Sequence, residues 1–415
     1  MASDSPKDEE SPFEPGSPPP YQVDAYPVVR PRRILLRNLC SVQVLLAIGL
    51  TLVVSWLCLI LERETKLRNV AQRVSPSPHL ERFERSLQHC ASLRTFPARP
   101  DPRSRTSNPR WNAIRGQQER VTLINATLFD GDKIHRQVVR DITFEKGLIV
   151  SVSETTDKSV FKEGIVYDVQ GRWVTPGLVD MHSHHAIAPW PAMAGNSDDN
   201  EMSPLFGPLT PFVRVIDSMK ASDPASTIIA SGGVTSSLII PGSANIMGGE
   251  GTVVKNALKS GELGEYVVEE LLLEHGIPIE ERHRYMKMAC GENPSRLYGH
   301  TRMGNAWVLR EHLAKAKEVM TEQDEYCAAA SRIASTSSTQ KLRFVDQMGS
   351  FPTDLKLEST VGMLRGRVAM QNHCYLPEDF ETMLRISHEF GFRVRAFHHA
   401  IEAWQVPEMI KAYGE

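Results

Sequence analysis

The sequence lacks several features that would place it in a class at once. Its six cysteines lie far apart, with no C-x-x-C pair and no spacing typical of zinc ligands, so they predict neither a zinc cluster nor a disulfide framework. Neither sign of charge is in excess, because 47 lysines and arginines oppose 50 aspartates and glutamates. The resulting net charge of −3 does not favour a nucleic-acid partner. The length of 415 residues allows one large domain with appendages.

One long apolar run stands out near the N-terminus. Residues 42–61 contain no charged side chain, and as a helix they would extend about 30 Å, which matches the core of a bilayer. A cleavable signal peptide fits less well, because the run is long, starts late and is not followed by a small-residue cleavage site. We therefore predict a single-pass membrane protein with a transmembrane helix at 42–61.

The segment before this run is predicted to be a disordered tail with a basic flank, residues 1–41, because it is rich in Pro, Ser, Asp and Glu. Four basic residues lie on each side of the apolar run, so their distribution does not fix its orientation. We expect a cytoplasmic N-terminus, since a short tail is easier to retain than the large remainder. The sequence from Pro18 to Tyr21 suits a WW domain, or is ordinary proline-rich linker.

The remaining chain divides into three parts by pattern. Residues 62–117 predict a stalk, with Leu80, Phe83 and Leu87 at helical spacing before a proline-rich connector. Residues 118–172 predict a small β-sandwich module, since strand-like runs alternate with turn residues. From 173 to 415, strand-like runs at 234–240, 285–290, 367–373 and 394–399 alternate with helical patterns. This alternation predicts an α/β fold with a parallel sheet, most simply a (β/α) barrel.

A histidine pair follows an earlier strand-like run, Gly171 to Val179. Asp180, His182 and His184 are spaced by two residues, so in a strand they lie on one side and the two imidazoles can bind one metal ion. His185 breaks the alternation and is expected to face away, where it packs or supports the others. A bare H-x-H is weak evidence, and here the Pro-Gly-opened strand before it strengthens the prediction.

Several further motifs occur in a consistent order along the chain. They are TPGLVDMHSH, Ser197 to Glu201, GVTSSLIIPGSANIMGGEGTVVKN, KMACGENPSR, the strand-end His373 and FHHAIEAW. Over residues 118–415 this set resembles the amidohydrolase superfamily, in particular its imidazolonepropionase-like branch. The chain is also similar to membrane-anchored fungal proteins labelled carbohydrate esterase family nine.

The resemblance implies a set of metal ligands. Two strand-one histidines, a group on a middle strand and two later histidines would hold one or two divalent metal ions, with zinc expected. Carried over, these positions are His182, His184, His373 and His399. The last is chosen over His398 because HHAIEAW matches the family's H-G-T-E-A pattern, and because only one of two adjacent residues is expected to point inward.

Lys287 is the candidate for the middle strand. Met286 and Met288 can face the helices, which leaves Lys287 facing the barrel interior, where burial promotes loss of its proton. The resemblance implies that such a lysine is carbamylated and bridges two metals. Two alternatives remain open: Lys287 extends from the barrel rim into water, or Glu292 provides the bridging carboxylate.

Together these features predict a membrane-anchored, metal-dependent hydrolase that cleaves an amide or cyclic amide of a small molecule with metal-activated water. The alternatives are a catalytically dead binding or scaffold module and a carbohydrate deacetylase. Counting from residue 174 gives about six strands, whereas a closed barrel has about eight. No residues remain for the strand-eight aspartate expected as catalytic base. We therefore expect a truncated barrel that is inactive or poorly folded.

Overall fold

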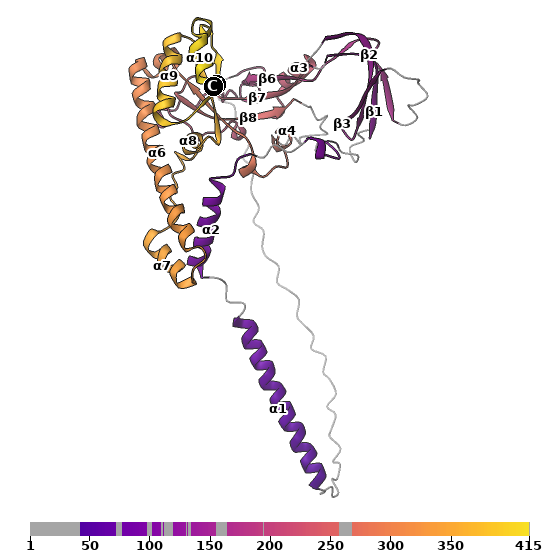
Figure 1. Cartoon of the computed structure of the whole chain (residues 1–415), viewed down its shortest axis with the longest axis vertical. Coiled ribbons are helices and arrows are strands. Elements are labelled where there is room, and N and C mark those ends of the chain that lie inside the picture. Colours follow the sequence, from indigo (N-terminus) through magenta and orange to yellow (C-terminus); the bar gives the residue numbers. More distant parts are fainter. Residues whose placement is uncertain are drawn as a thin grey trace, which may run out of the picture. The chain divides into compact units, whose positions relative to one another are not determined.

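The computed structural model describes residues 42–71, 77–97, 102–108, 111, 119–129, 131, 134–154, 164–193, 195–256 and 268–414. The chain divides into two compact units, Met1–Ser75 and Pro76–Glu415. Figure 1 shows the elements of both units. The predicted tail and its Pro18 to Tyr21 motif lie outside the described residues.

The described residues of the first unit form a helix, α1, at Val42–Ala71. It takes in the apolar run and continues past Leu61 through a charged segment that begins with Glu62 and Arg63. Among the residues with a described structure, no helix is both long enough and apolar enough to cross a membrane. The structure therefore does not support the transmembrane helix expected at 42–61.

The second unit begins with a helix and then forms a five-stranded sheet. The elements are α2 (Pro78–Ser92), η1 (Pro102–Ser104), β1 (Arg120–Phe129), β2 (Ile134–Glu145), β3 (Leu148–Glu154), β4 (Ile165–Asp168) and β5 (Trp173–Val174). The strand order is β3-β2-β1-β4, and β5 also pairs with β1. The described strands of this module thus form one sheet rather than a sandwich, and the module extends to residue 174, two residues past its predicted end.

A second, six-stranded sheet follows, in the order β11-β10-β9-β8-β7-β6. Its strands are β6 (Leu178–Ser183), β7 (Val234–Ile239), β8 (Met247–Lys255), β9 (Arg284–Ala289), β10 (Val368–Cys374) and β11 (Val394–His399). The sheet is not wholly parallel as predicted, because β8 runs antiparallel to both β7 and β9. The short link at 240–246 cannot hold the crossover that a parallel neighbour requires, so the chain turns back on itself.

The six-stranded sheet curls into a nearly closed barrel. Its two end strands, β6 and β11, approach each other closely enough for His182 Nδ1 to lie 2.8 Å from His398 Nδ1. In the described part of the chain no backbone ladder joins these two strands. The barrel is therefore closed at this point by histidine side chains.

Helices surround this sheet. They are η4 (Val215–Asp217), α3 (Pro224–Ser231), α4 (Val268–Leu271), η5 (Ile279–Glu281), α5 (Glu292–Tyr298), α6 (Arg302–Ile333), α7 (Ser338–Met348), α8 (Glu358–Leu364), α9 (Pro377–Phe390), η6 (Ala403–Gln405) and α10 (Pro407–Gly414). Helices α6, α8 and α9 cover the outer face of β9 and β10 (Figure 1). Met286, Met288 and Phe380 are fully buried in this core.

Helix α2 packs against α6 and α7 through a small aromatic core. Phe83 and Tyr326 are buried there, and the ring of Phe344 contacts both edge-on. A disulfide between Cys90 and Cys327 joins α2 to α6, with Cα atoms 5.5 Å apart. The segment predicted as a stalk is thus partly built into the second unit.

Candidate functional site

The strand ends bring five histidines together. His182 lies in β6 and His184 directly follows it, His373 lies at the end of β10, and His398 and His399 lie at the end of β11. The ring centre of His182 lies 4.8 Å from those of His184 and His398 and 4.4 Å from that of His399. The rings of His373 and His399 are 5.0 Å apart. All four histidines predicted as ligands therefore lie in one cluster, which His398 joins.

Hydrogen bonds fix which nitrogens of this cluster carry protons. His184 Nδ1 lies 2.7 Å from the Ile240 carbonyl, which can only accept, so His184 Nε2 is left unprotonated. His398 Nε2 donates in the same way to Gln371 Oε1 at 2.8 Å. Its Nδ1 must then accept from His182 Nδ1, which leaves His182 Nε2 unprotonated as well. Both free lone pairs meet, with the two Nε2 atoms 3.1 Å apart.

Two lone pairs this close repel each other unless both are directed at one cation. Burial, followed by the nearby Lys287 ammonium, lowers the pKa of His182 to about 2, so a proton does not fill this role at neutral pH. Burial also lowers the pKa of His184. Two nitrogens bound to one tetrahedral zinc ion lie about 3.3 Å apart. The pair therefore fits two positions of a metal coordination sphere.

The remaining ligands of such a sphere are not assembled. In the part of the chain that the structure describes, no three His, Cys, Asp or Glu side chains are arranged as ligands of one metal ion. His398 Nδ1 cannot be the third ligand, because it contacts His182 Nδ1, whereas the metal position lies at His182 Nε2 on the other side of that ring. The site thus supplies a preformed histidine pair with other candidate ligands beside it.

The end of β11 corrects one prediction. His398 and His399 were expected to point in opposite directions, but the ring of each lies against His182. The reason is the backbone of His399, whose φ of 61° is in the left-handed region and breaks the alternation of the strand. His398 is buried and hydrogen-bonded, whereas His399 is exposed.

Lys287 lies inside the barrel and is fully buried, which excludes a position on the rim. Its Nζ donates to Ser243 Oγ at 2.8 Å and to the Pro241 carbonyl at 3.2 Å. Burial lowers the pKa of Lys287 to about 7, against the opposing effect of the Asp199 carboxylate. Its amine is therefore close to losing its proton at neutral pH. Asp199, which also raises the pKa of His184, is a site carboxylate that the motif analysis did not select.

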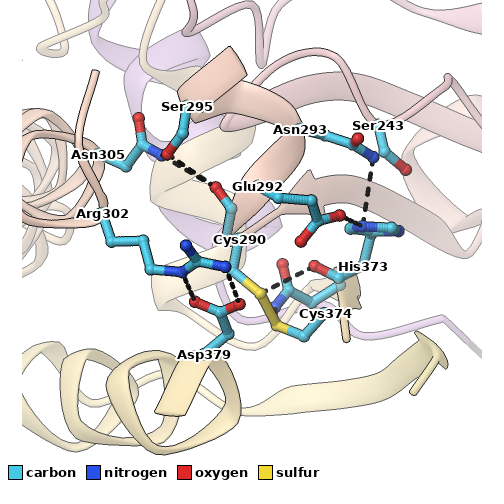
Figure 2. A network of polar contacts seen from close by, with 12 residues as sticks. Ser243, Cys290, Glu292, Asn293, Ser295, Arg302, Asn305, His373, Cys374 and Asp379 are labelled. Atoms are coloured by element: carbon cyan, nitrogen blue, oxygen red, sulfur yellow. Dashed lines mark hydrogen bonds and ion pairs between the residues drawn. A yellow bond between two sulfur atoms is a disulfide. The ribbon is translucent and has the colours of Figure 1, made fainter. Parts of the chain in front are cut away.

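Glu292 is engaged elsewhere. Its Oε1 accepts a hydrogen bond from His373 Nε2 at 2.8 Å, as Figure 2 shows. The other atoms of this pair, Glu292 Oε2 and His373 Nδ1, are buried and have no hydrogen-bond partner. Burial lowers the pKa of His373, while the Glu292 carboxylate raises it. Glu292 and His373 thus form a carboxylate–imidazole pair in which each residue keeps one polar atom without a hydrogen-bond partner.

His185 takes the role of a supporting residue. It is buried, and its Nδ1 lies 2.7 Å from Ser183 Oγ. Since Ser183 faces away from His182 and His184 along β6, so does His185.

Comparison with known proteins gives two relevant matches. No family model matches the sequence. A protein named amidohydrolase tasK, from Hapsidospora irregularis, is 34% identical over 400 residues, which covers 91% of this chain and 38% of that relative. The crystal structure of an amidohydrolase from Thermotoga maritima MSB8 is similar with a TM-score of 0.54 and 30% identity, covering 70% of this chain and 67% of that one. The chain therefore spans little more than a third of the length of the curated relative.

Proposed function

Because the chain belongs to the amidohydrolase superfamily, we propose that it is a metal-dependent hydrolase that cleaves a non-peptide carbon–nitrogen bond, an amide or cyclic amide, in a small molecule. The observation that carries this proposal is the pair of unprotonated nitrogens, His182 Nε2 and His184 Nε2, 3.1 Å apart. In an enzyme of this type a divalent metal, here expected to be zinc, polarises a carbonyl and lowers the pKa of bound water.

The residues of the cluster divide into three roles in this proposal. His182 and His184 would hold the metal, and Ile240 and Gln371 keep their lone pairs available through hydrogen bonds. His373, His399 and Lys287 are the further candidate ligands. Whether one or two ions bind depends on these three.

In this proposal the carboxylate of Glu292 carries out proton transfer. Glu292 Oε2 has no hydrogen-bond partner in the structure, so it can accept a proton from an attacking water. His373 Nε2 holds Glu292 Oε1 in place and stabilises its charge. This assignment gives Glu292 the role of a base rather than of a metal bridge.

Two substrate classes fit this proposal. Resemblance to the imidazolonepropionase-like branch favours a cyclic amide, whereas resemblance to carbohydrate esterase family nine favours an N-acetylated sugar. A binding or scaffold module without catalysis is the third reading.

Metal analysis combined with a hydrolase assay tests the proposal. The full chain is expected to carry about one or two zinc ions and to hydrolyse members of a panel of amides, cyclic amides and N-acetylated sugars. His184→Asn should lose the metal and the activity. His185→Asn, which alters the buried neighbour that faces away, should keep both.

Each other outcome has a defined reading. A metal-free protein without activity on the panel contradicts the proposal and supports the binding module. Activity confined to N-acetylated sugars identifies a deacetylase instead. Equal metal loss in both histidine variants would show that the loss reflects folding and not ligation.

A further inference from the structure

The two loops that carry Glu292 and His373 are joined by a disulfide. Cys290 follows β9 and comes two residues before Glu292, while Cys374 directly follows His373 at the end of β10. The bridge has a Cα–Cα distance of 5.3 Å and both cysteines are buried. It lies beside the Glu292–His373 contact in Figure 2.

The turn between the bridge and Glu292 is held on its other sides as well. The Gly291 carbonyl accepts hydrogen bonds from Ser295 Oγ at 2.9 Å and from Asn305 Nδ2 at 3.4 Å. The Asp379 carboxylate, paired with Arg302 at 2.8 Å, fills the space beside the Gly291 Cα atom. With φ at 74°, Gly291 adopts a backbone conformation that favours glycine.

The side chain of Glu292 itself is held by few contacts. Only Oε1 is hydrogen-bonded, to His373, and Oε2 has no partner. Between the two loops, a backbone hydrogen bond from Cys290 N–H to the His373 carbonyl, at 2.9 Å, and a contact of Asn293 Nδ2 with His373 Nε2, at 3.3 Å, accompany the disulfide. The position of Glu292 therefore depends on how firmly these two loops are joined.

We propose that the Cys290–Cys374 disulfide is a positioning element that holds the Glu292 carboxylate against His373. This inference rests on the proposed function, in which Glu292 accepts a proton. The other disulfide, Cys90–Cys327, joins α2 to α6 through a separate aromatic core and does not adjoin the histidine cluster. It provides a matched control within the same chain.

The experiment compares Cys290→Ser/Cys374→Ser with Cys90→Ser/Cys327→Ser in the full chain. On an amide substrate, the first variant and Glu292→Gln are each expected to lower kcat at least about tenfold with KM nearly unchanged. Adding Glu292→Gln to the first variant should then cost little more, whereas adding it to the control should cost the full effect.

A second readout does not require activity. Nitrogen NMR of the His373 ring should show the same change in Cys290→Ser/Cys374→Ser as in Glu292→Gln, and no change in the control. An unaltered His373 signal and kcat in the first variant would overturn the proposal. If no form turns over any substrate, the proposed function has failed, and the NMR signal alone decides whether the bridge positions Glu292. If serine prevents folding, Cys290→Ala/Cys374→Val replaces it.

Discussion

At the scale of single residues, the protonation of the histidine cluster is set by two neutral oxygens. The Ile240 carbonyl and Gln371 Oε1 each accept a hydrogen bond from an imidazole N–H, which leaves the lone pairs of His182 and His184 facing each other. Hydrogen bonds of this kind orient metal ligands and fix their tautomers in known sites. The H-x-H motif identifies the histidines, but the acceptors come from β10 and from the loop after β7, which only the fold brings near.

Lys287 gives a prediction for stability against pH. Its pKa is about 7 in the folded protein, below the ordinary value of 10.5, so between these two pH values the unfolded chain binds more protons. The contribution of this residue to stability therefore increases as the pH rises through that window and is least favourable below pH ~7. At pH ~6, the free energy of unfolding of Lys287→Met should exceed that of the wild type by up to about 4 kcal/mol, so the variant should unfold at a higher temperature. This difference in stability should shrink toward pH ~10.

The matched control for this change is Lys411→Met, at an exposed position on α10. It should leave the pH dependence of unfolding unchanged. A difference between Lys287→Met and wild type that is the same at both ends of the window would show that burial does not perturb this lysine.

At the scale of elements, the local sequence pattern predicts a helix or strand correctly where the tertiary packing agrees with that pattern. Strand β11 has its predicted bounds. Helix α9 before it is a predicted kind of element, with Phe380 and Met383 buried on one face and an αL glycine, Gly391, at its end. Strand β8 was not among the predicted strands, so its antiparallel direction was missed as well. Both disulfides were missed too, since partners 84 and 237 residues apart leave no spacing signal.

The contact of α2 with α6 and α7 gives a prediction at this scale. Phe83 is fully buried and its ring lies 5.7 Å from that of Phe344. Phe83→Ala should lower the free energy of unfolding by about 3–5 kcal/mol, because the variant loses the buried ring and its neighbours only partly relax into the cavity that remains. Phe96→Ala, at a site 57% exposed, should change it by less than about 0.5 kcal/mol. Equal effects in denaturant unfolding would mean that α2 does not pack on α6 and α7.

At the scale of the whole molecule, two predictions concern segments that the structure does not describe. The cytoplasmic N-terminus and the WW-domain contact at Pro18 to Tyr21 rest on sequence alone. The histidine site, by contrast, depends on strands at both ends of a six-stranded sheet. No single segment could have shown that His182 and His398 touch, because 216 residues separate them.

The two disulfides also predict where the second unit matures. Stable disulfides form in oxidising compartments and are rare in the cytosol. Four cysteines, Cys90, Cys327, Cys290 and Cys374, are paired in the structure. In cell extracts prepared with acid quenching, these four should react with a maleimide reagent only after reduction, which adds four labels to the Pro76–Glu415 unit. Cys90→Ser/Cys327→Ser should reduce the gain to two. Labelling of all four before reduction would place this unit in a reducing compartment, where Glu292 would have to be held without the covalent bridge.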